Sequence, residues 1–204
     1  MRIGIIGAGN VGRALANGWR VRRHEVVFGV RDPASAKHAG IDVPLMANAE
    51  AARRADVVVF ATPWDATREA VASCGNLAGK VVLDATNPLL PGLSGLDHAD
   101  GKSGAEKVAS WASGARVVKV FNTTGFNNMA NPRYAEGRSM MLYCGDDEGA
   151  KRIAKELAED LGFHAIDFGP LANARYSENL AMVWIWLALK GGLGRDIAFV
   201  LARR

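Results

Sequence analysis

The chain has 204 residues, which suits one domain of ordinary size and leaves little room for a second complete one. Its composition, 49% hydrophobic and 23% charged with a mean hydropathy of +0.01, is that of a soluble globular protein and excludes disordered, fibrous and disulfide-stapled classes. The net charge is +4, but the basic residues are scattered. We therefore expect no nucleic-acid partner, while the basic balance favours an anionic ligand.

Neither a membrane nor a metal is indicated. The longest apolar run, Leu180–Leu189, has ten residues, about half of what a membrane-spanning helix needs. The glycine-rich start of the chain fits a nucleotide-binding turn better than a signal peptide, so we expect a cytoplasmic protein. Cys74 and Cys144 have no metal-ligand spacing and are expected to be packing residues.

Short runs rich in valine and isoleucine alternate with helical stretches along the chain, which is typical of an α/β, doubly wound Rossmann fold with a parallel sheet. In chain order, the predicted strands are Arg2–Ile6, Glu25–Gly29, Asp56–Ala61, Lys80–Asp84, Arg116–Phe121, Ser139–Cys144 and His164–Phe168. The predicted helices between them are Asn10–Arg20, Ala47–Arg54, Ala66–Ser73, Ala105–Trp111 and Asp147–Leu161. Gly162 follows the last of these helices as its C-cap.

Beyond the seventh strand, one long helix is predicted over Asn173–Leu189, polar at its start and apolar on all sides from Leu180 onward. Such a helix must be buried on several sides, over the sheet edge or against a second copy of the protein. Glycines at positions 191, 192 and 194 break it, and a short terminal helix is expected near Asp196–Leu201. The sequence thus predicts a Rossmann domain over residues 1–170 and a short C-terminal helical appendage, residues 171–204, packed on the same domain.

The chemistry begins at a glycine-rich turn, Gly7-Ala8-Gly9-Asn10-Val11-Gly12, which follows the first predicted strand and opens the first predicted helix. In such a turn the first glycine permits the tight bend, the second lets a pyrophosphate approach the backbone, and the third permits close packing of helix on strand. The helix N-terminus adds N–H groups and a positive dipole end. The turn therefore predicts a dinucleotide site that includes Gly7, Gly9, Asn10, Val11 and Gly12.

The end of the second predicted strand indicates which dinucleotide the turn would hold. NAD enzymes place a carboxylate there for the ribose 2′-hydroxyl, whereas NADP enzymes place an arginine for the 2′-phosphate. Arg31 stands just past the strand, and Asp32 is expected to cap a helix begun by Pro33. The sequence favours NADP(H) on Arg31, with further contacts from Ser35 and Lys37. For Lys37, a solvated surface charge is an equal interpretation.

Polar and small residues also gather after three further predicted strands. The loops are Ala61-Thr62-Pro63-Trp64, Asp84-Ala85-Thr86-Asn87-Pro88-Leu89 and Phe121-Asn122-Thr123-Thr124-Gly125. Each alone is ordinary turn chemistry, but ligands of such sheets bind at the C-terminal ends of the strands. Together the loops predict a pocket for the nicotinamide.

Eight segments along the chain form a recurring set: Gly7–Gly12, Gly29–Asp32, Ala61–Trp64, Asp84–Leu89, Lys119–Thr123, Met129–Pro132, Gly169–Leu171 and Ala174–Glu178. In this order they resemble the NADPH-dependent reductases of the deazaflavin coenzyme F-420 and their bacterial relatives. The Rossmann unit is also similar to the cytoplasmic reductase domain of the six-transmembrane metalloreductases. Val30 departs from the family, whose members commonly carry Ser or Thr there, and this removes one hydroxyl from the predicted phosphate site.

The resemblance implies an oxidoreductase that transfers a hydride between NADP(H) and a small-molecule acceptor, coenzyme F-420 or a flavin, with placement doing the catalysis. It implies that the nicotinamide is positioned by Thr62, Pro63, Asn122 and Thr123. Further coenzyme contacts are implied for Ala61 and Asn87. The acceptor pocket is expected to contain Trp64, Pro88, Leu89, Thr123, Arg175 and Tyr176. The four histidines are scattered, and we expect them at surface or packing positions.

Two other functions remain open from the sequence. The first is reduction of a small imine or keto substrate, although such reductases need a large helical C-terminal domain and only about thirty-five residues follow Phe168 here. The second is a non-catalytic NADP(H)-binding module. Turnover of NADPH with a deazaflavin or flavin would separate an enzyme from such a module.

The long C-terminal helix carries two further expectations. Its start, residues 174–179, is expected to face the Thr62-Pro63 loop, with Arg175 and Tyr176 holding the acceptor or the nicotinamide; the alternative is that Arg175 pairs with Glu178. Its apolar half, which holds two tryptophans, predicts a homodimer with this helix or residues 194–204 at or near the interface. The alternative is that both tryptophans pack inside their own subunit.

Overall fold

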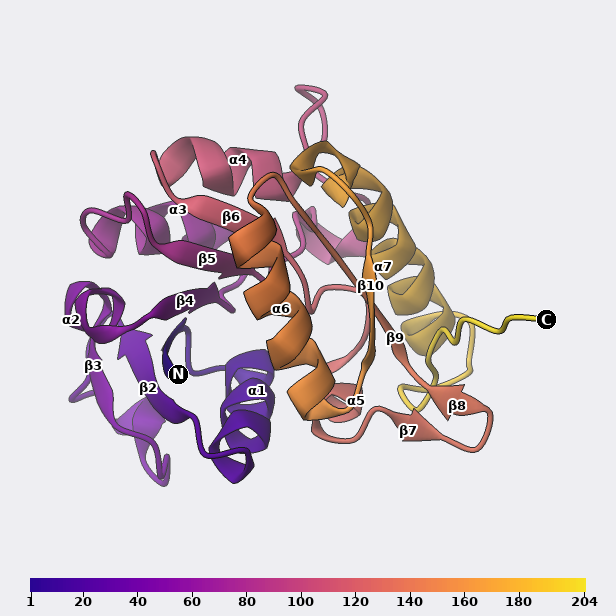
Figure 1. Ribbon diagram of the computed structural model, residues 1–204, viewed down its shortest axis with the longest axis horizontal. Coiled ribbons are helices and arrows are strands. Elements are labelled where there is room, and N and C mark those ends of the chain that lie inside the picture. The colour runs from indigo at the N-terminus through magenta and orange to yellow at the C-terminus, as the bar shows by residue number, and fades with distance from the viewer.

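Eight strands form the central sheet of the computed structural model, which describes residues 1–204 (Figure 1). Their order across the sheet is β10-β9-β6-β5-β4-β1-β2-β3. The strands are β1 (Arg2–Ile6), β2 (Glu25–Val30), β3 (Leu45–Ala47), β4 (Val57–Phe60), β5 (Val81–Asp84), β6 (Arg116–Lys119), β9 (Met140–Gly145) and β10 (His164–Asp167). All seven predicted strands are present, whereas β3 and the separate hairpin of β7 (Arg133–Tyr134) and β8 (Gly137–Arg138) were not predicted.

Helices cover both faces of this sheet (Figure 1). The helices are α1 (Asn10–Val21), α2 (Asn48–Arg54), α3 (Trp64–Ser73), α4 (Gly104–Trp111), α5 (Phe126–Ala130), α6 (Glu148–Leu161) and α7 (Ala174–Leu189), with 3₁₀ turns η1 (Ala36–His38), η2 (Pro91–Leu93) and η3 (Leu171–Asn173). Six of the predicted helices are confirmed as α1, α2, α3, α4, α6 and α7, whereas α5 was not predicted. Gly162 caps α6 in the left-handed conformation, as expected.

The core has two halves, one on each side of the sheet. On one side, α1, α5 and α6 pack on the strands, where Trp19 meets the edge of Phe121 at 5.5 Å between ring centroids and donates its indole N–H to the carbonyl of Leu157. On the other side, α2, α3 and α4 pack on the strands with small side chains such as Ala51 and Ala70. Every residue of β4 and β5 is buried, which explains their unbroken apolar sequences.

The sheet is parallel, as predicted, except at one pair of strands. β9 runs antiparallel to β6, with Val118 opposite Gly145, while β10 runs parallel to β9. A parallel neighbour needs a connection that crosses back over the sheet. The chain between β6 and β9 instead forms α5, which packs against α1, and the β7–β8 hairpin, so it re-enters the sheet at the end where β6 left it.

No helix begins at Pro33, which corrects a second expectation. Asp32 does not cap a helix: its Oδ1 accepts a hydrogen bond from the backbone N–H of Ala34 at 3.0 Å, which closes a short turn. The only helical turn in this stretch is η1, and its N-cap residue is Ser35. The segment after β2 therefore stays a surface loop.

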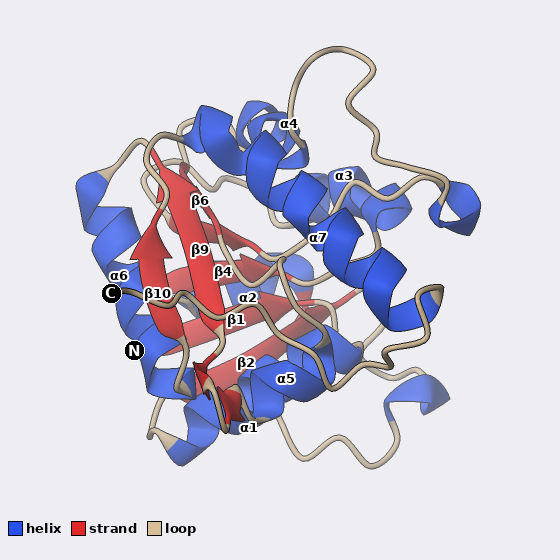
Figure 2. Cartoon of the chain, turned by 90° about the vertical axis from the view of Figure 1, so that its right-hand side faces the viewer, coloured by secondary structure: helices blue, strands red, loops and turns tan.

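The terminal helix expected near Asp196–Leu201 is also absent. The backbone of this segment bonds to other parts of the fold instead: the carbonyl of Ile197 accepts from the indole N–H of Trp184 at 2.8 Å and from the amide of Asn128 at 2.7 Å. The same segment pairs with the backbone at the start of β9, and Figure 2 shows it running across β9 and β10. Carbonyls used in this way are not available for a helical ladder.

Helix α7 lies beside α4 and is buried on one side only (Figure 2). Trp184 is buried, whereas Val183, Trp186 and Leu189 are exposed at a spacing of three residues. The alternative in which both tryptophans pack inside their own subunit is therefore wrong for Trp186. No helix of the structure, α7 included, combines the length and the hydropathy that crossing a membrane requires.

Cys74 and Cys144 are free and buried, as the sequence predicted. Burial raises the pKa of each thiol to about 12. Both thiols therefore stay protonated near neutral pH and act as small apolar side chains.

Candidate functional site

The glycine-rich turn between β1 and α1 has a separate structural reason for each of its glycines. Gly7 has φ 110°, and a Cβ there would lie 2.7 Å from the carbonyl oxygen of Ala61. A Cβ on Gly12 would overlap the carbonyl oxygen of Gly7. A Cβ on Gly9 would find nothing within 4 Å, so Gly9 faces open space. This is the arrangement that a pyrophosphate lying against Gly9 requires.

The N-terminus of α1 is open for an anion. Gly9 is its N-cap residue and carries no side chain, and the first turn contains no acidic residue. Asn10, Val11 and Gly12 form that first turn, so their N–H groups point out of the helix end. The coenzyme contacts predicted for these three residues would therefore be made by their backbone N–H groups at the helix end.

A cleft of about 540 Å³ opens directly on this turn, between the end of β2, the end of β4 and helix α3. It brings together seven of the sequence-predicted coenzyme residues: Gly7, Gly9, Arg31, Lys37, Ala61, Thr62 and Pro63. Ser35 does not line it, although the neighbouring η1 turn does. The Thr62 hydroxyl lies 2.9 Å from that of Thr67, the Oγ1 of which donates to the carbonyl of Pro63 and fixes this loop at the start of α3.

Arg31 reaches across the cleft to an acid that the sequence did not single out. Its Nη2 atom is 3.0 Å from Oε2 of Glu69 on α3, and the two side chains are 72% and 69% exposed. An ion pair in such a solvated position contributes little to stability and is free to rearrange. Arg31 is therefore available to a ligand, but Glu69 competes for it.

The next two strand ends, those of β5 and β6, are tied together by an asparagine pair. The amide of Asn87 donates to the carbonyl of Asn122 at 2.9 Å, and the amide of Asn122 donates to Oδ1 of Asn87 at 3.1 Å. Asn122 is buried, and its own Oδ1 has no partner. Phe121, just before it, has φ 63°, a strained conformation for a residue with a side chain. Such strain and unpaired polar atoms gather at functional sites.

A fully buried cluster of charged side chains adjoins the loop that carries Asn87. Lys119, at the end of β6, places its Nζ 2.8 Å from Asp84, 2.8 Å from Glu178 of α7 and 2.7 Å from the carbonyl of Thr86. Burial by itself would lower the pKa of Lys119, but the charges of Asp84 and Glu178 raise it above its ordinary value. The ammonium therefore holds the loop that carries Asn87 against the ends of two strands.

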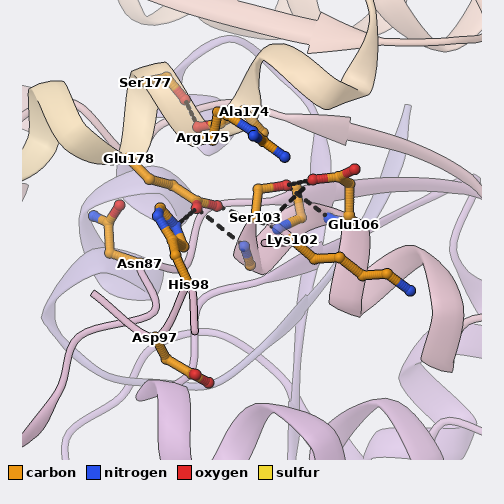
Figure 3. Close-up of polar contacts among 12 residues, drawn as sticks. Asn87, Asp97, His98, Lys102, Ser103, Glu106, Ala174, Arg175, Ser177 and Glu178 are labelled. Carbon is orange, nitrogen blue, oxygen red and sulfur yellow. Dashed lines mark hydrogen bonds and ion pairs between the residues drawn. The ribbon is translucent and has the colours of Figure 1, made fainter. Parts of the chain in front are cut away.

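Glu178 also contacts His98 and the start of α4 (Figure 3). Its Oε2 lies 2.6 Å from Nε2 of His98 and accepts from the backbone N–H of Gly104 at 3.0 Å, at the start of α4. Burial favours a raised pKa for Glu178, but the charge of Lys119 and these hydrogen bonds hold the pKa below its ordinary value. One carboxylate thus joins α7, α4, β6 and the loop that follows β5.

The residues predicted for the acceptor pocket lie outside the cleft. The indole N–H of Trp64 donates to Asp97 at 3.1 Å, and its ring packs on Trp111. Leu89 pairs with Leu96 through an isolated β-bridge, and Pro88 precedes it in the same loop. Thr123 is buried beside Met141.

Arg175 and Tyr176 are separated from the cleft as well. Arg175 donates to the carbonyl of Gly101, and Tyr176 is exposed with its ring edge against Phe168. Neither residue lines the cleft beside Thr62. The alternative pairing of Arg175 with Glu178 is wrong, because Glu178 is fully buried and bonded elsewhere (Figure 3).

The site contains residues that sequence analysis missed. Glu69, Asn48 and Ser73 line the cleft from helices, where a single polar residue gives no signal of its own. Lys119 did carry a signal, because a lysine inside the apolar run Val117–Phe121 predicts a buried charge that needs a partner. No group of three or more His, Cys, Asp or Glu side chains lies together to hold a metal ion.

A strand, a glycine turn with an open helix end, and an arginine after the second strand together define a dinucleotide-binding Rossmann protein. A family model described as "NADP oxidoreductase coenzyme F420-dependent" matches residues 2–88. The F420-dependent NADP reductase of Methanothermobacter thermautotrophicus is 32% identical over 93% of this chain and 90% of its own length. The chain belongs to this family of NADP-dependent oxidoreductases.

Two further proteins show how far the similarity extends. A crystal structure of a candidate F420-dependent NADP reductase from Arthrobacter sp. FB24 superposes with a TM-score of 0.88 at 34% identity, over the whole of both chains. The metalloreductase STEAP3 of Rattus norvegicus is 32% identical over 89% of this chain, which spans only 36% of the metalloreductase. The similarity to the reductases thus covers nearly the full length of both proteins, whereas the similarity to the metalloreductase covers only about a third of that protein.

Proposed function

We propose that this protein transfers a hydride between NADP(H) and the deazaflavin ring of coenzyme F-420 or a flavin. The observation that carries the proposal is the cleft that joins the open Gly9 turn to the cationic pair Arg31 and Lys37. A dinucleotide needs a glycine turn for its pyrophosphate and cations for a 2′-phosphate, and one cleft supplies both. Family membership supports the same coenzyme.

The chain's own residues would bind and orient. Bound NADPH supplies the hydride, so the protein has to place the coenzyme and exclude water. Gly7, Gly9 and the N-terminus of α1 would hold the pyrophosphate, and Arg31 would hold the 2′-phosphate. Thr62 and Pro63, together with the Asn87–Asn122 pair, would position the nicotinamide. Neither Asn87 nor Asn122 lines the cleft itself, and the unpaired Oδ1 of Asn122 is buried, so the pair would act by holding the ends of β5 and β6 in place.

The acceptor class follows from what surrounds the cleft. The two histidine–carboxylate pairs of the fold, His24–Asp160 and His98–Glu178, both lie outside it. His38 does line the cleft, but from the η1 turn after β2, at the end proposed for the 2′-phosphate. Direct transfer of a hydride to a stacked ring needs no such pair, whereas reduction of a small carbonyl ordinarily uses a proton donor at the oxygen. This difference favours a deazaflavin or a flavin over an imine or keto substrate.

The test is steady-state oxidation of NADPH in the presence of coenzyme F-420, FMN, FAD and a panel of small imines and carbonyls. We expect turnover with one or more of the ring acceptors and none with the small carbonyls. Turnover confined to an imine or keto substrate would replace the proposed acceptor class. NADPH binding without oxidation by any acceptor would leave the protein a non-catalytic coenzyme-binding module.

A further inference from the structure

Glu69 is the only acidic residue that lines the cleft. It stands on α3, opposite the end of β2, and it is bonded to the arginine best placed to recognise a 2′-phosphate. Arg13 and Lys37 are the other fully charged side chains along the cleft, and both are cations. The adenosine end of the proposed site therefore carries three cationic side chains, Arg13, Arg31 and Lys37, and one carboxylate, that of Glu69.

That carboxylate has opposite effects on the two coenzymes. A 2′-phosphate on Arg31 adds negative charge beside Glu69, so the two anions repel each other and compete for one guanidinium. A ribose 2′-hydroxyl is neutral, and a carboxylate at this end of a Rossmann site is the group that NAD enzymes use to accept its proton in a hydrogen bond. Glu69 thus weakens the binding of a 2′-phosphate to Arg31, and so of NADP(H), but does not weaken the binding of NAD(H).

We propose that Glu69 is a specificity-determining residue that narrows the preference for NADP(H) and lets the cleft bind NAD(H) as well. The strand-tip acid of NAD enzymes is missing from β2, and Glu69 supplies a carboxylate from α3 instead. Because both partners of the ion pair are well exposed, the pair opens at little cost when a phosphate arrives. This inference rests on the proposed function, since it takes the cleft to be the coenzyme site.

The test is the variant Glu69→Gln, which removes the charge and keeps the size of the side chain. Dissociation constants for NADPH and NADH would be measured by calorimetric titration. We expect NADPH to bind about three- to tenfold more tightly to the variant, and NADH to bind equally or more weakly. The same gain is expected for adenosine 2′,5′-bisphosphate, which carries the phosphate without the nicotinamide, and not for AMP.

The control is Glu159→Gln on α6, an exposed acid outside the cleft that pairs with Lys155 and gives the same change in net charge. It should leave the ratio of the two affinities unchanged. A ratio that stays within about twofold of the wild-type value in Glu69→Gln, or that rises equally in both variants, overturns the role of Glu69. Failure of the wild-type protein to bind either dinucleotide would instead overturn the proposed function, so the two failures are distinguishable.

Discussion

Gly12 and Gly9 play different parts in the turn, and alanine substitutions separate them. A methyl group on Gly12 overlaps the carbonyl oxygen of Gly7, so Gly12→Ala must displace the turn. We expect it to lower the free energy of unfolding by about 1–3 kcal/mol and to abolish coenzyme binding. Gly9→Ala places its methyl group in open space, so stability should be unchanged while NADPH binding weakens. Thermal unfolding and NADPH titration of both variants check this; equal stability loss in the two would contradict it.

Arg31 is expected to discriminate between the coenzymes, even with Glu69 beside it. Charge-assisted hydrogen bonds to phosphate are worth roughly 1.5–3 kcal/mol. Because Arg31 must first leave Glu69, we expect Arg31→Ala to weaken NADPH binding by about tenfold, near the lower end of that range, and to leave NADH binding almost unchanged. Arg53→Ala, which removes an exposed arginine from α2, is the matched control. Equal losses for NADPH and NADH would show that Arg31 does not contact the 2′-phosphate.

The contrast between Arg31 and Glu69 shows what sequence can predict about a site. Arg31 was predictable because it follows a strand directly, and the position just past that strand has a fixed meaning in a Rossmann fold. Glu69 was not, because it lies on a helical surface whose orientation depends on packing between α3 and the sheet. The same holds for Glu178, whose partners come from β6, α4 and a loop some eighty residues earlier.

At the scale of elements, the ion cluster at Lys119 fastens α7 to the sheet. Lys119→Met leaves the buried carboxylates of Asp84 and Glu178 without their cation, and we expect a loss of about 3–5 kcal/mol in the free energy of unfolding. Chemical denaturation measures this directly. Lys155→Met, at an exposed position of α6, should have almost no effect. Similar stabilities of the two variants would contradict the structural role of the cluster.

The same cluster predicts how stability depends on pH. The lowered pKa of Glu178 means that its ionised form stabilises the fold above its ordinary pKa of 4.5 and that this contribution is lost as the pH falls through the lower, folded-state value. The raised pKa of Lys119 means that its contribution is lost only as the pH rises past 10.5 and through the folded-state value. We expect Glu178→Gln to flatten the acidic side of the stability profile and to move the alkaline loss of stability to lower pH, because Glu178 is one of the two carboxylates that raise the pKa of Lys119. An unchanged acidic side would contradict this assignment.

The elements that were predicted have a clear sequence signal, such as an apolar run or a helix cap, and the elements that were missed do not. The buried strands read as runs of valine and isoleucine, and α6 carries caps at both ends, so both kinds of element could be placed within two residues. β3, β7 and β8 have only two or three residues each, too few to show a period. The direction of β9 depends on how the preceding connection packs, and the terminal segment gives its carbonyls to distant donors. Both features depend on contacts between residues far apart in the sequence, so a local sequence pattern does not predict them.

At the scale of the whole molecule, the exposed stripe on α7 supports the proposal of a homodimer. Val183, Trp186 and Leu189 face outward together, and two-fold pairing is the commonest way in which such surfaces are covered. Light scattering coupled to size-exclusion chromatography should give twice the chain mass of 21.7 kDa. Trp186→Glu should give the monomer, and Val21→Glu, an exposed site on α1, should not. A monomeric wild-type protein at micromolar concentration would contradict the dimer.

The central claim is that the coenzyme held in this cleft passes its hydride directly to a ring acceptor. It is tested most directly with NADPH that carries deuterium at the transferable position of the nicotinamide, incubated with coenzyme F-420 and the protein. A deazaflavin accepts the hydride at carbon, so mass spectrometry of the reduced coenzyme reports the transfer. We predict deuterium on the deazaflavin and its loss when Gly12→Ala replaces the wild-type protein. Reduced coenzyme F-420 without deuterium would contradict direct transfer, and bound NADPH that neither coenzyme F-420 nor a flavin oxidises would contradict the claim.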